Sequence, residues 1–543
     1  MMAPKSPTKN QKGELMKKNI HALKAFTALF VVCLALLLSG CDIASNKNSG
    51  LTRDEDPMGE NPTENITNEE IVNTFPADEF DFETNEDGTL TLVINDKTTC
   101  GKLLIIPSYY NGKAITQIKR AYHSEQKNTT VEKLVIPDTV KTIGSNSFLY
   151  FQNLKEVVIG NGVTTIDDGA FMDCKSLKTV TLGNSVTKLK AHAFNGCNSL
   201  ESINLPSSLT SIGYHAFSNC TKIKEITLPS SLQTIERGAF NTCDSLTKIE
   251  IPGSVKTVSE EAFNHCRNLT EVTLGSGIEK IERKAFNFCI NLKKIDLPDS
   301  ITDIGSEAFA SCGLESFTVP KSVTVIPDGM LSACNSLSHL TLHDKITAIG
   351  SEAFSNCAFS AIELPDSITT ISAQAFRGCL NLTAIKLPSN ITYIAPRMFE
   401  SCKFSTLNIP DSVTSIGDYA FLSCYDLTEL ELPASLSEIS EKAFMCTSIA
   451  SIEIPDGITE IKENVFSLND NLTTVSLPSS IEKIGESFLQ FCTNFSTVNY
   501  DGTIEEWNAI EKHENWLFEA PQFTVICLDG NVEYENHMSE LQE

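Results

Sequence analysis

The sequence repeats itself every 22 or 23 residues from about residue 130 to residue 500, and this period limits the folds that the chain can adopt. Three copies read LESINLP, LKKIDLP and LTELELP, starting at Leu200, Leu292 and Leu427. A segment of this length cannot bury its own apolar face, whereas a stack of such segments can. The chain is therefore predicted to form one repeat solenoid, although its length alone would suggest about three or four globular domains. The proline position of the repeat, filled by glycine or histidine in four copies, falls at residues 137, 160, 183, 206, 229, 252, 275, 298, 320, 343, 365, 388, 410, 433, 455 and 478.

Each copy divides into a strand and a return segment. The strand has apolar residues at the alternating positions of an L-x-x-[IV]-x-[IL] pattern, and its Val, Ile and Thr residues favour β structure. Proline follows because it has no N–H group to donate to a ladder. Strands of successive copies are expected to pair in one parallel sheet, ~4.8 Å apart. The return segment contains an Ala-Phe pair, as at Ala193-Phe194, and we expect these phenylalanines to stack on the opposite side.

The complete consensus is L-P-x-S-[VIL]-T-x-I-G-x-x-A-F-x-x-C-x-x-L, seen from Leu205 to Cys220 and from Leu297 to Cys312. This pattern resembles the BspA-like leucine-rich-repeat family of bacterial surface proteins over about residues 80–500. The resemblance implies an α/β-type repeat fold dominated by β structure: a right-handed solenoid with a parallel β-sheet on one face and short turns or helical segments on the other. It also implies binding, because members of this family are commonly adhesins that engage host matrix or plasma proteins, other bacteria or host cells.

The first forty residues have the composition of an export signal. A basic stretch ending at Lys24 precedes a nearly unbroken apolar run from Ala25 to Leu38. This run of 14 residues is too short to span the ~30 Å hydrocarbon layer but has the length of a signal-peptide core. It ends in Leu38-Ser39-Gly40-Cys41, which resembles the lipobox of bacterial lipoproteins. The resemblance implies that Cys41 carries a lipid and becomes the mature N-terminus, whereas an ordinary signal peptide with a chance cysteine is the alternative.

The whole sequence is predicted to divide into five regions: a lipoprotein signal peptide (1–40), a disordered acidic tether (41–76), an N-terminal cap with an irregular first repeat (77–130), about sixteen repeats (131–500), and a C-terminal cap and tail (501–543). The tether has too little apolar surface to fold. Either Met1 or Met16 is the start. Loss of residues 1–40 removes six lysines and Glu14, so the formal net charge changes from −27 to −32. The mature chain is expected to be exported and anchored to a membrane through Cys41. Surface display is favoured, although Asp42 resembles an inner-membrane retention signal of some enteric bacteria.

Both ends of the repeat array have the features of caps. Residues 80–94 predict a hairpin that turns at Asn85-Glu-Asp-Gly88. Beyond a last strand at residues 495–500, the spacing of Tyr500, Gly502, Thr503 and Trp507 is similar to the terminal segment of many family members. Trp507 and Trp516 are expected to seal the last turn, and a sugar-binding aromatic platform is the alternative.

Fourteen cysteines are predicted to occupy one repeat position as a ladder of buried thiols. Phe151 and Asn469 fill that position in two other copies, so the position requires bulk or a weak polar contact rather than redox or metal chemistry. Cys100 and Cys527 lie near opposite ends of the solenoid and cannot pair within one molecule. We therefore predict no network of structural disulfides. The fourteen cysteines are at positions 174, 197, 220, 243, 266, 289, 312, 334, 357, 379, 402, 424, 446 and 492.

The sequence contains no recognisable catalytic motif. Walker-type, H-E-x-x-H, C-x-x-C and G-x-S-x-G patterns are all absent. His192 and His215 lie one repeat apart and are predicted to stack, without a third residue to complete a metal site. We predict no enzyme activity, no catalytic residue, no metal and no cofactor. The acidic net charge argues against a nucleic-acid partner, because phosphates are held by clustered Lys and Arg.

The outward row of the predicted sheet is the remaining candidate for function. Its side chains are mostly small, hydroxylic or acidic, which fits either a merely soluble face or an extended surface for a large partner. The favoured function is a lipid-anchored cell-surface binding protein, an adhesin that engages a host matrix or cell-surface protein or glycan. The alternative is an envelope structural, scaffolding or glycan-binding lipoprotein that faces the bacterium's own polymers. The candidate ligand-facing residues are Thr179, Thr181, Ser202, Asn204, Glu225, Thr227, Lys248, Glu250, Glu271, Thr273, Glu429 and Glu431.

Overall fold

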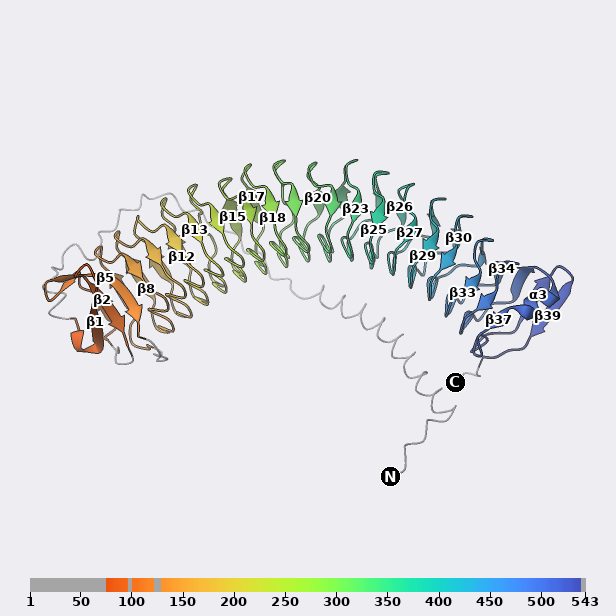
Figure 1. Ribbon diagram of the computed structural model, residues 1–543, viewed down its shortest axis with the longest axis horizontal. Coiled ribbons are helices and arrows are strands. Elements are labelled where there is room, and N and C mark those ends of the chain that lie inside the picture. Colours follow the sequence, from red (N-terminus) through yellow and green to blue (C-terminus); the bar gives the residue numbers. More distant parts are fainter. Residues whose placement is uncertain (1–74, 96–99, 122–127, 539–543) are drawn as a thin grey trace, which may run out of the picture. The chain divides into compact units, whose positions relative to one another are not determined.

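The computed structural model describes residues 75–95, 100–121 and 128–538, and these residues form a parallel β-solenoid (Figure 1). All of them belong to one compact unit, residues 66–543. Successive turns stack in chain order, so each turn packs on its sequence neighbours. The predicted signal peptide, Cys41 and nearly all of the predicted tether lie outside the described residues.

The predicted strand segments form a parallel ladder, called here the front ladder. Its register advances by one repeat per strand, so Val180 lies between Val157 and Ile203. In the turns at Glu225 and Lys294 the same row continues without a regular strand. The strands are β3 (Leu103–Ile105), β6 (Lys133–Ile136), β8 (Glu156–Ile159), β10 (Thr179–Thr181), β12 (Ser202–Asn204), β15 (Lys248–Ile251), β17 (Glu271–Leu274), β20 (Ser316–Thr318), β22 (His339–Thr341), β24 (Ala361–Glu363), β26 (Ala384–Lys386), β28 (Thr406–Asn408), β30 (Glu429–Glu431), β32 (Ser451–Glu453), β34 (Thr474–Pro478), β36 (Thr497–Asp501) and β38 (Phe523–Cys527).

A second parallel ladder runs along the solenoid where the sequence predicted only turns or helical segments. Most of its strands are two residues long, with the first side chain at least partly exposed and the second buried, as at Thr165 and Ile166. Among the described residues, helix is limited to η1 (Ala77–Glu79) and α3 (Ile504–Ala509). The second ladder comprises β5 (Lys113–Arg120), β7 (Thr142–Ile143), β9 (Thr165–Ile166), β11 (Lys188–Leu189), β13 (Ser211–Ile212), β14 (Thr234–Ile235), β16 (Thr257–Val258), β18 (Lys280–Ile281), β19 (Asp303–Ile304), β21 (Val325–Ile326), β23 (Ala348–Ile349), β25 (Thr370–Ile371), β27 (Tyr393–Ile394), β29 (Ser415–Ile416), β31 (Glu438–Ile439), β33 (Glu460–Ile461), β35 (Lys483–Ile484) and β37 (Glu511–Lys512).

The phenylalanines of the return segments stack inside the core, as predicted. From Phe148 to Phe309 each ring lies 5.2 to 5.7 Å from the ring of the next turn, within 10° of parallel. Leu331 interrupts the row with a fully buried side chain, and the stack resumes at Phe354. These rings are fully buried, so they supply a large share of the apolar area that stabilises each turn.

Serine and threonine hydroxyls satisfy backbone carbonyl groups of the preceding turn. Thr187 donates to Thr164 O (3.1 Å) and Ser231 donates to Leu209 O (2.7 Å). The same bond recurs beside the front ladder, where Thr270 donates to Thr247 O (3.0 Å). The Ser231 bond is half-buried, and a half-buried carbonyl group needs such a partner. The Thr bonds are exposed and add to backbone bonds that Thr164 O and Thr247 O already accept from Thr187 N and Thr270 N.

The ladder of buried cysteines is present, and its thiol groups contact backbone carbonyl oxygens of the preceding turn. Cys220 Sγ lies 3.2 Å from Phe194 O of the preceding turn, and the equivalent contact recurs along the ladder. Asn469 makes the equivalent hydrogen bond at its own position in the ladder, where its Nδ2 donates to Phe444 O at 2.8 Å. Burial raises the pKa of the Cys174 thiol to about 12. The position therefore holds a compact hydrogen-bond donor in most turns, although Phe151 fills it in one turn with a buried ring.

The prediction that Cys446 belongs to this ladder is wrong. Cys446 lies two residues after Phe444, whereas the ladder cysteines lie three residues after the stacked side chain. Cys446 is only partly buried and has a left-handed backbone, with φ 59°. Thr447 is buried in its place and donates both its N–H and its hydroxyl to Asn469 Oδ1, at 2.6 and 2.7 Å.

The N-terminal end begins with the predicted hairpin. β1 (Phe80–Thr84) pairs antiparallel with β2 (Leu90–Ile94). β2 then pairs with β5 and so joins the hairpin to the second ladder. β4 (Tyr109–Tyr110) pairs antiparallel with the start of β5.

The C-terminal end is sealed by aromatic side chains, as predicted. β39 (Gly530–Tyr534) pairs antiparallel with β38, and the capping box of Thr503 and Glu506 starts α3. Trp507 is completely buried and donates from Nε1 to Tyr534 Oη at 3.0 Å. Trp516 stacks on Phe488 with ring centroids 5.9 Å apart. A fully buried Trp507 has no face to offer a sugar, so the platform interpretation is wrong for this residue.

Candidate binding surface

The outward side chains of the front ladder form a regular exposed row. In β10 the middle residue Val180 is buried, while Thr179 and Thr181 on either side of it are exposed. The same alternation recurs in β15 and β30 because successive strand residues point to opposite faces. All twelve candidate ligand-facing residues are exposed. Their role in binding remains a prediction.

The strand register brings ten of these twelve residues into neighbouring turns. Thr179 and Thr181 pair with Ser202 and Asn204 across β10 and β12. Two turns further on, β15 and β17 pair Lys248 with Glu271 and Glu250 with Thr273. The turn of Glu225 and Thr227 lies between these pairs and reaches β15 through a bridge from Glu225 to Lys248. Glu429 and Glu431 are on β30 and are separated from this group by the turns that contain β20 to β28.

Several charges in the N-terminal half of the row are paired across neighbouring strands. Lys248 Nζ lies 2.7 Å from Glu271 Oε1, and this hydrogen bond raises the pKa of Lys248. Lys133 makes the equivalent contact with Glu156 at 2.8 Å. Exposed pairs of this kind contribute little to stability, because water and salt screen them. Their main effect here is to leave the local surface nearly neutral.

A cleft at the C-terminal end of the front ladder was not predicted from the sequence, which suggested no pocket. It encloses about 420 Å³ beside β32, β34, β36 and β38. Asp501 and Leu528 lie where earlier turns have Pro455 and Pro478, and this loss of proline is the one sequence signal that marks the site. The lining residues are Glu453, Ile454, Asp456, Ser476, Leu477, Pro478, Asn499, Tyr500, Asp501, Ile526, Cys527 and Leu528.

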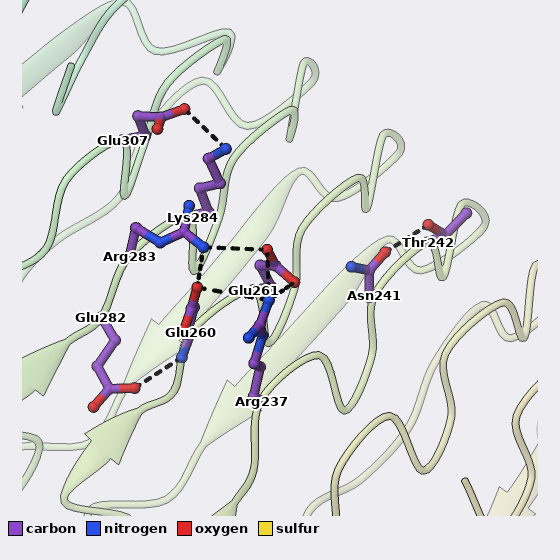
Figure 2. A network of polar contacts seen from close by, with 9 residues as sticks. All are labelled: Arg237, Asn241, Thr242, Glu260, Glu261, Glu282, Arg283, Lys284 and Glu307. Carbon is purple, nitrogen blue, oxygen red and sulfur yellow. Dashed lines mark hydrogen bonds and ion pairs between the residues drawn. The ribbon is translucent and has the colours of Figure 1, made fainter.

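The return segments contain a network of ion pairs in the middle turns (Figure 2). Arg283 pairs with Glu260 and lies 3.7 Å from Glu261, which Arg237 also approaches at 3.4 Å. The two carboxylates raise the pKa of Arg237. Lys284, next to Arg283, pairs with Glu307 of the following turn at 3.3 Å. The network is self-compensating, so it offers little net charge to a partner.

The predicted pair of histidines also stacks in the return segments. The rings of His192 and His215 are 5.7 Å apart and parallel within 2°. Burial, reinforced by His192, lowers the pKa of His215. Within the described ranges, no three His, Cys, Asp or Glu side chains come together as a possible metal site. The helices of the described part of the chain are all too short or too polar to cross a membrane.

Comparison with known proteins matches the repeat array to one family. The family model described as "BspA type Leucine rich repeat region" matches residues 119–244, 188–313, 302–425 and 393–511, which together exceed half of the chain. None of the curated proteins matches the sequence.

Several solved structures are similar to this chain. A leucine-rich repeat protein from Bacteroides ovatus ATCC 8483 is 25% identical, with a TM-score of 0.52, and the match covers 83% of this chain and 99% of that one. A leucine-rich cell surface protein from Faecalibacterium prausnitzii A2-165 is 22% identical, with a TM-score of 0.37 and coverages of 80% and 97%. A leucine-rich repeat protein from Eubacterium ventriosum ATCC 27560 is 22% identical, with a TM-score of 0.37 and coverages of 66% and 95%. The first of these supports the solenoid fold over most of the chain.

Proposed function

The chain belongs to the BspA-type leucine-rich repeat family, and we propose that it is a cell-surface binding protein whose front ladder contacts a macromolecular partner. The observation that carries this proposal is the exposed outward row, which keeps one register over many turns. Neighbouring strands lie ~4.8 Å apart, so the row is a long and rigid surface.

The chemistry of the row suits a large partner. Thr179, Thr181 and Ser202 are short, so they lose little side-chain entropy when a partner covers them. Their hydroxyl groups both donate and accept hydrogen bonds, which fits protein backbone or glycan hydroxyls. Apart from the C-terminal cleft the row is open, and such surfaces bind large partners rather than small molecules.

The finer proposal is a lipid-anchored adhesin that engages host matrix or plasma proteins or other cells. Its support is the Leu38-Ser39-Gly40-Cys41 sequence and the resemblance to surface proteins. Metabolic labelling with a radioactive fatty acid tests the anchor: the wild-type chain should be labelled, and Cys41→Ser should not. An unlabelled wild-type chain would refute lipid anchoring while leaving the binding function in place.

The binding function is tested by screening the full chain, in detergent, against immobilised matrix proteins, plasma proteins and glycans. The test variant is Thr181→Arg with Asn204→Arg, two paired residues of the front ladder. The control is Ser211→Arg with Thr234→Arg, a matched pair on the second ladder. We expect saturable binding that the front-ladder variant weakens about tenfold or more and that the control retains. Absence of binding to every probe, or equal loss in both variants, would refute the proposal.

Protease treatment of intact cells separates the adhesin from the envelope scaffold. An adhesin on the cell surface should be cut, whereas a protein facing the bacterium's own polymers should be protected until the envelope is opened. Protection of the chain in intact cells would favour the scaffold.

A further inference from the structure

We infer that the C-terminal cleft of the front ladder is a docking site for a partner-protein segment that places a lysine or arginine side chain beside an apolar one. The inference rests on the proposed binding function and assigns it a site and a partner chemistry. The cleft lies on four consecutive strands, β32, β34, β36 and β38, of one hydrogen-bonded sheet.

The floor of the cleft is formed by Ser476 and Asn499, the middle of a column of outward residues in strict register whose two ends, Glu453 and Ile526, belong to the walls. Glu453 pairs with Ser476, Ser476 with Asn499, and Asn499 with Ile526. The neighbouring column contains Pro478 paired with Asp501. An extended segment laid across these strands would place every second side chain toward the floor.

One wall of the cleft is exposed apolar surface. Ile526 is 45% exposed and Leu528 is 73% exposed. Most earlier turns of the front ladder have Thr, Ser, Asn or a charged residue at the position of Ile526. A hydrogen bond from Leu528 N to Gly502 O, at 2.9 Å, holds this wall against the end cap. An exposed apolar group beside a cavity is a typical anchor for a partner side chain.

The other wall is negatively charged. Glu453, Asp456 and Asp501 are exposed, and none of them forms an ion pair with a described Lys, Arg or His. From Glu429 to Ile526 the outward row of the described strands contains no Lys or Arg. This part of the row differs from β15 and β17, where Lys248 neutralises Glu271. It also differs from the paired network of the return segments in Figure 2.

The acidic wall and the apolar wall together indicate which kind of partner segment the cleft binds. An uncompensated acidic wall attracts a cation and improves both its rate of association and its specificity. The apolar wall adds area that a bare cation cannot use, so a segment with both kinds of side chain fits better than a metal ion. The volume of about 420 Å³ lies in the range of small-ligand pockets and can take a few side chains, not a folded domain.

Fluorescence anisotropy with the full chain and three labelled peptides tests the inference. The first peptide, acetyl-Lys-Ser-Leu-Ser-Lys-amide, places two cations and one apolar group on the same face. The second has Glu in place of Lys, and the third has Ser in place of Leu. We expect saturable binding of the first peptide only, weakening as salt is raised.

Two variants and one control locate the site. Glu453→Gln with Asp501→Asn, and separately Ile526→Thr with Leu528→Ser, should each weaken binding about fivefold or more. Glu363→Gln is the matched control, because Glu363 is an exposed carboxylate at the same strand position in β24. This control should bind like the wild type. Circular dichroism of each variant checks that the fold is retained.

Four results would overturn the inference: no saturable binding of the first peptide, equal binding of the Glu peptide, unchanged binding by either cleft variant, or saturable calcium binding that the acidic variant abolishes. Failure of the proposed function gives a different pattern. In that case no matrix protein, plasma protein or glycan binds the chain, whatever the peptides do. Macromolecular binding that the cleft variants leave unchanged, together with no peptide binding, refutes the cleft alone.

Discussion

At the scale of single residues, each turn uses two left-handed backbone positions. One lies directly before the Ala-Phe pair, as at Glu261 (φ 57°), and the other lies directly before the ladder cysteine, as at Thr242 (φ 60°). The left-handed conformation destabilises a residue with a Cβ by about 1–2 kcal/mol, and it suits β-branched residues least. Both positions lie in the return segment, on either side of the phenylalanine whose ring stacks on those of the neighbouring turns.

Thr242 is the residue whose replacement should stabilise the protein. Gly196 and Asn219 occupy the same repeat position, and both residue types tolerate a left-handed backbone. We expect Thr242→Asn to raise the free energy of unfolding by about 1 kcal/mol. Thr234→Asn, at an exposed strand position, is the control and should not stabilise. Guanidinium denaturation measures both changes. A less stable Thr242→Asn chain would show that the Thr242 hydroxyl bond to Asn241 Oδ1 outweighs the backbone strain.

Among the cysteines that the structure describes, thiol labelling of the folded protein should single out Cys446. Burial raises the pKa of the ladder thiols, to about 12 at Cys174 and Cys266, so at pH 8 they are protonated as well as inaccessible. The pKa of Cys100 is also about 12, because of burial and of Glu79. Iodoacetamide at pH 8 should therefore modify Cys446 first, as measured by mass spectrometry of peptides. Cys446→Ser should remove this fast phase. Equal modification of Cys446 and the ladder cysteines would contradict the assigned positions.

Cys446 also shows a limit of sequence-based prediction at this scale. The ladder position was predictable from its period as a buried site with a weak polar contact, and the structure shows this contact at Cys174, Cys220 and Asn469. Counting residues from Phe444 is enough to show that Cys446 is displaced by one, but the period alone did not show which residue is buried in its place. The buried Thr447 hydroxyl bonded to Asn469 is a matched pair between two turns, visible only when both turns are placed.

At the scale of elements, the phenylalanine stack is a contact repeated from turn to turn in the core. Phe240 stacks on Phe217 at 5.4 Å and on Phe263 at 5.3 Å, and it is completely buried. We expect Phe240→Ala to lower the free energy of unfolding by about 3–5 kcal/mol, through lost burial and a cavity. Phe240→Leu should cost less, about 1–2 kcal/mol, because Leu331 fills the same position. Chemical denaturation of both variants measures the difference. Equal losses would mean that the volume restored by Leu contributes nothing and that the aromatic ring itself accounts for the whole effect.

The two ladders differ in how well the sequence predicts them. The front ladder was predictable because Leu, Ile and Val alternate with polar residues over several positions. The second ladder has two residues per turn, as in Thr165-Ile166, so it shows no alternation. Its hydrogen bonds come from the stacking of one turn on the next, as in Ser211 paired with Thr234. Local sequence therefore carries no independent signal for it.

At the scale of the whole molecule, the surface chemistry changes along the solenoid. The outward row was predictable as a list of exposed positions, because the period alone assigns them. The cleft was not, since it depends on β36 and β38 stacking in register so that Asp501 and Leu528 flank the column of Ser476 and Asn499. Regular turns with paired charges thus lead into a terminal segment with unpaired carboxylates.

Because each turn contacts only its neighbours, the protein should tolerate the loss of one complete turn. Deleting residues 207–229 joins Pro206 to Ser230 and brings together turns that present equivalent positions. Phe240 can then stack on Phe194, and Cys243 can donate to the carbonyl that Cys220 uses now. We expect a folded chain with a β-rich circular dichroism spectrum and cooperative unfolding, because solenoid stability is close to a sum of neighbouring interfaces.

Deleting residues 207–218 alone is the matched control. It removes about half a turn, so the next strand would enter the stack out of phase and its apolar residues would face the wrong side. This variant should lose cooperative unfolding and aggregate, as size-exclusion chromatography and thermal denaturation would show. Equal behaviour of the two deletions would contradict the nearest-neighbour picture. If the longer deletion unfolds as well, contacts between distant turns contribute to stability. If both remain folded, register is not what holds the turns together.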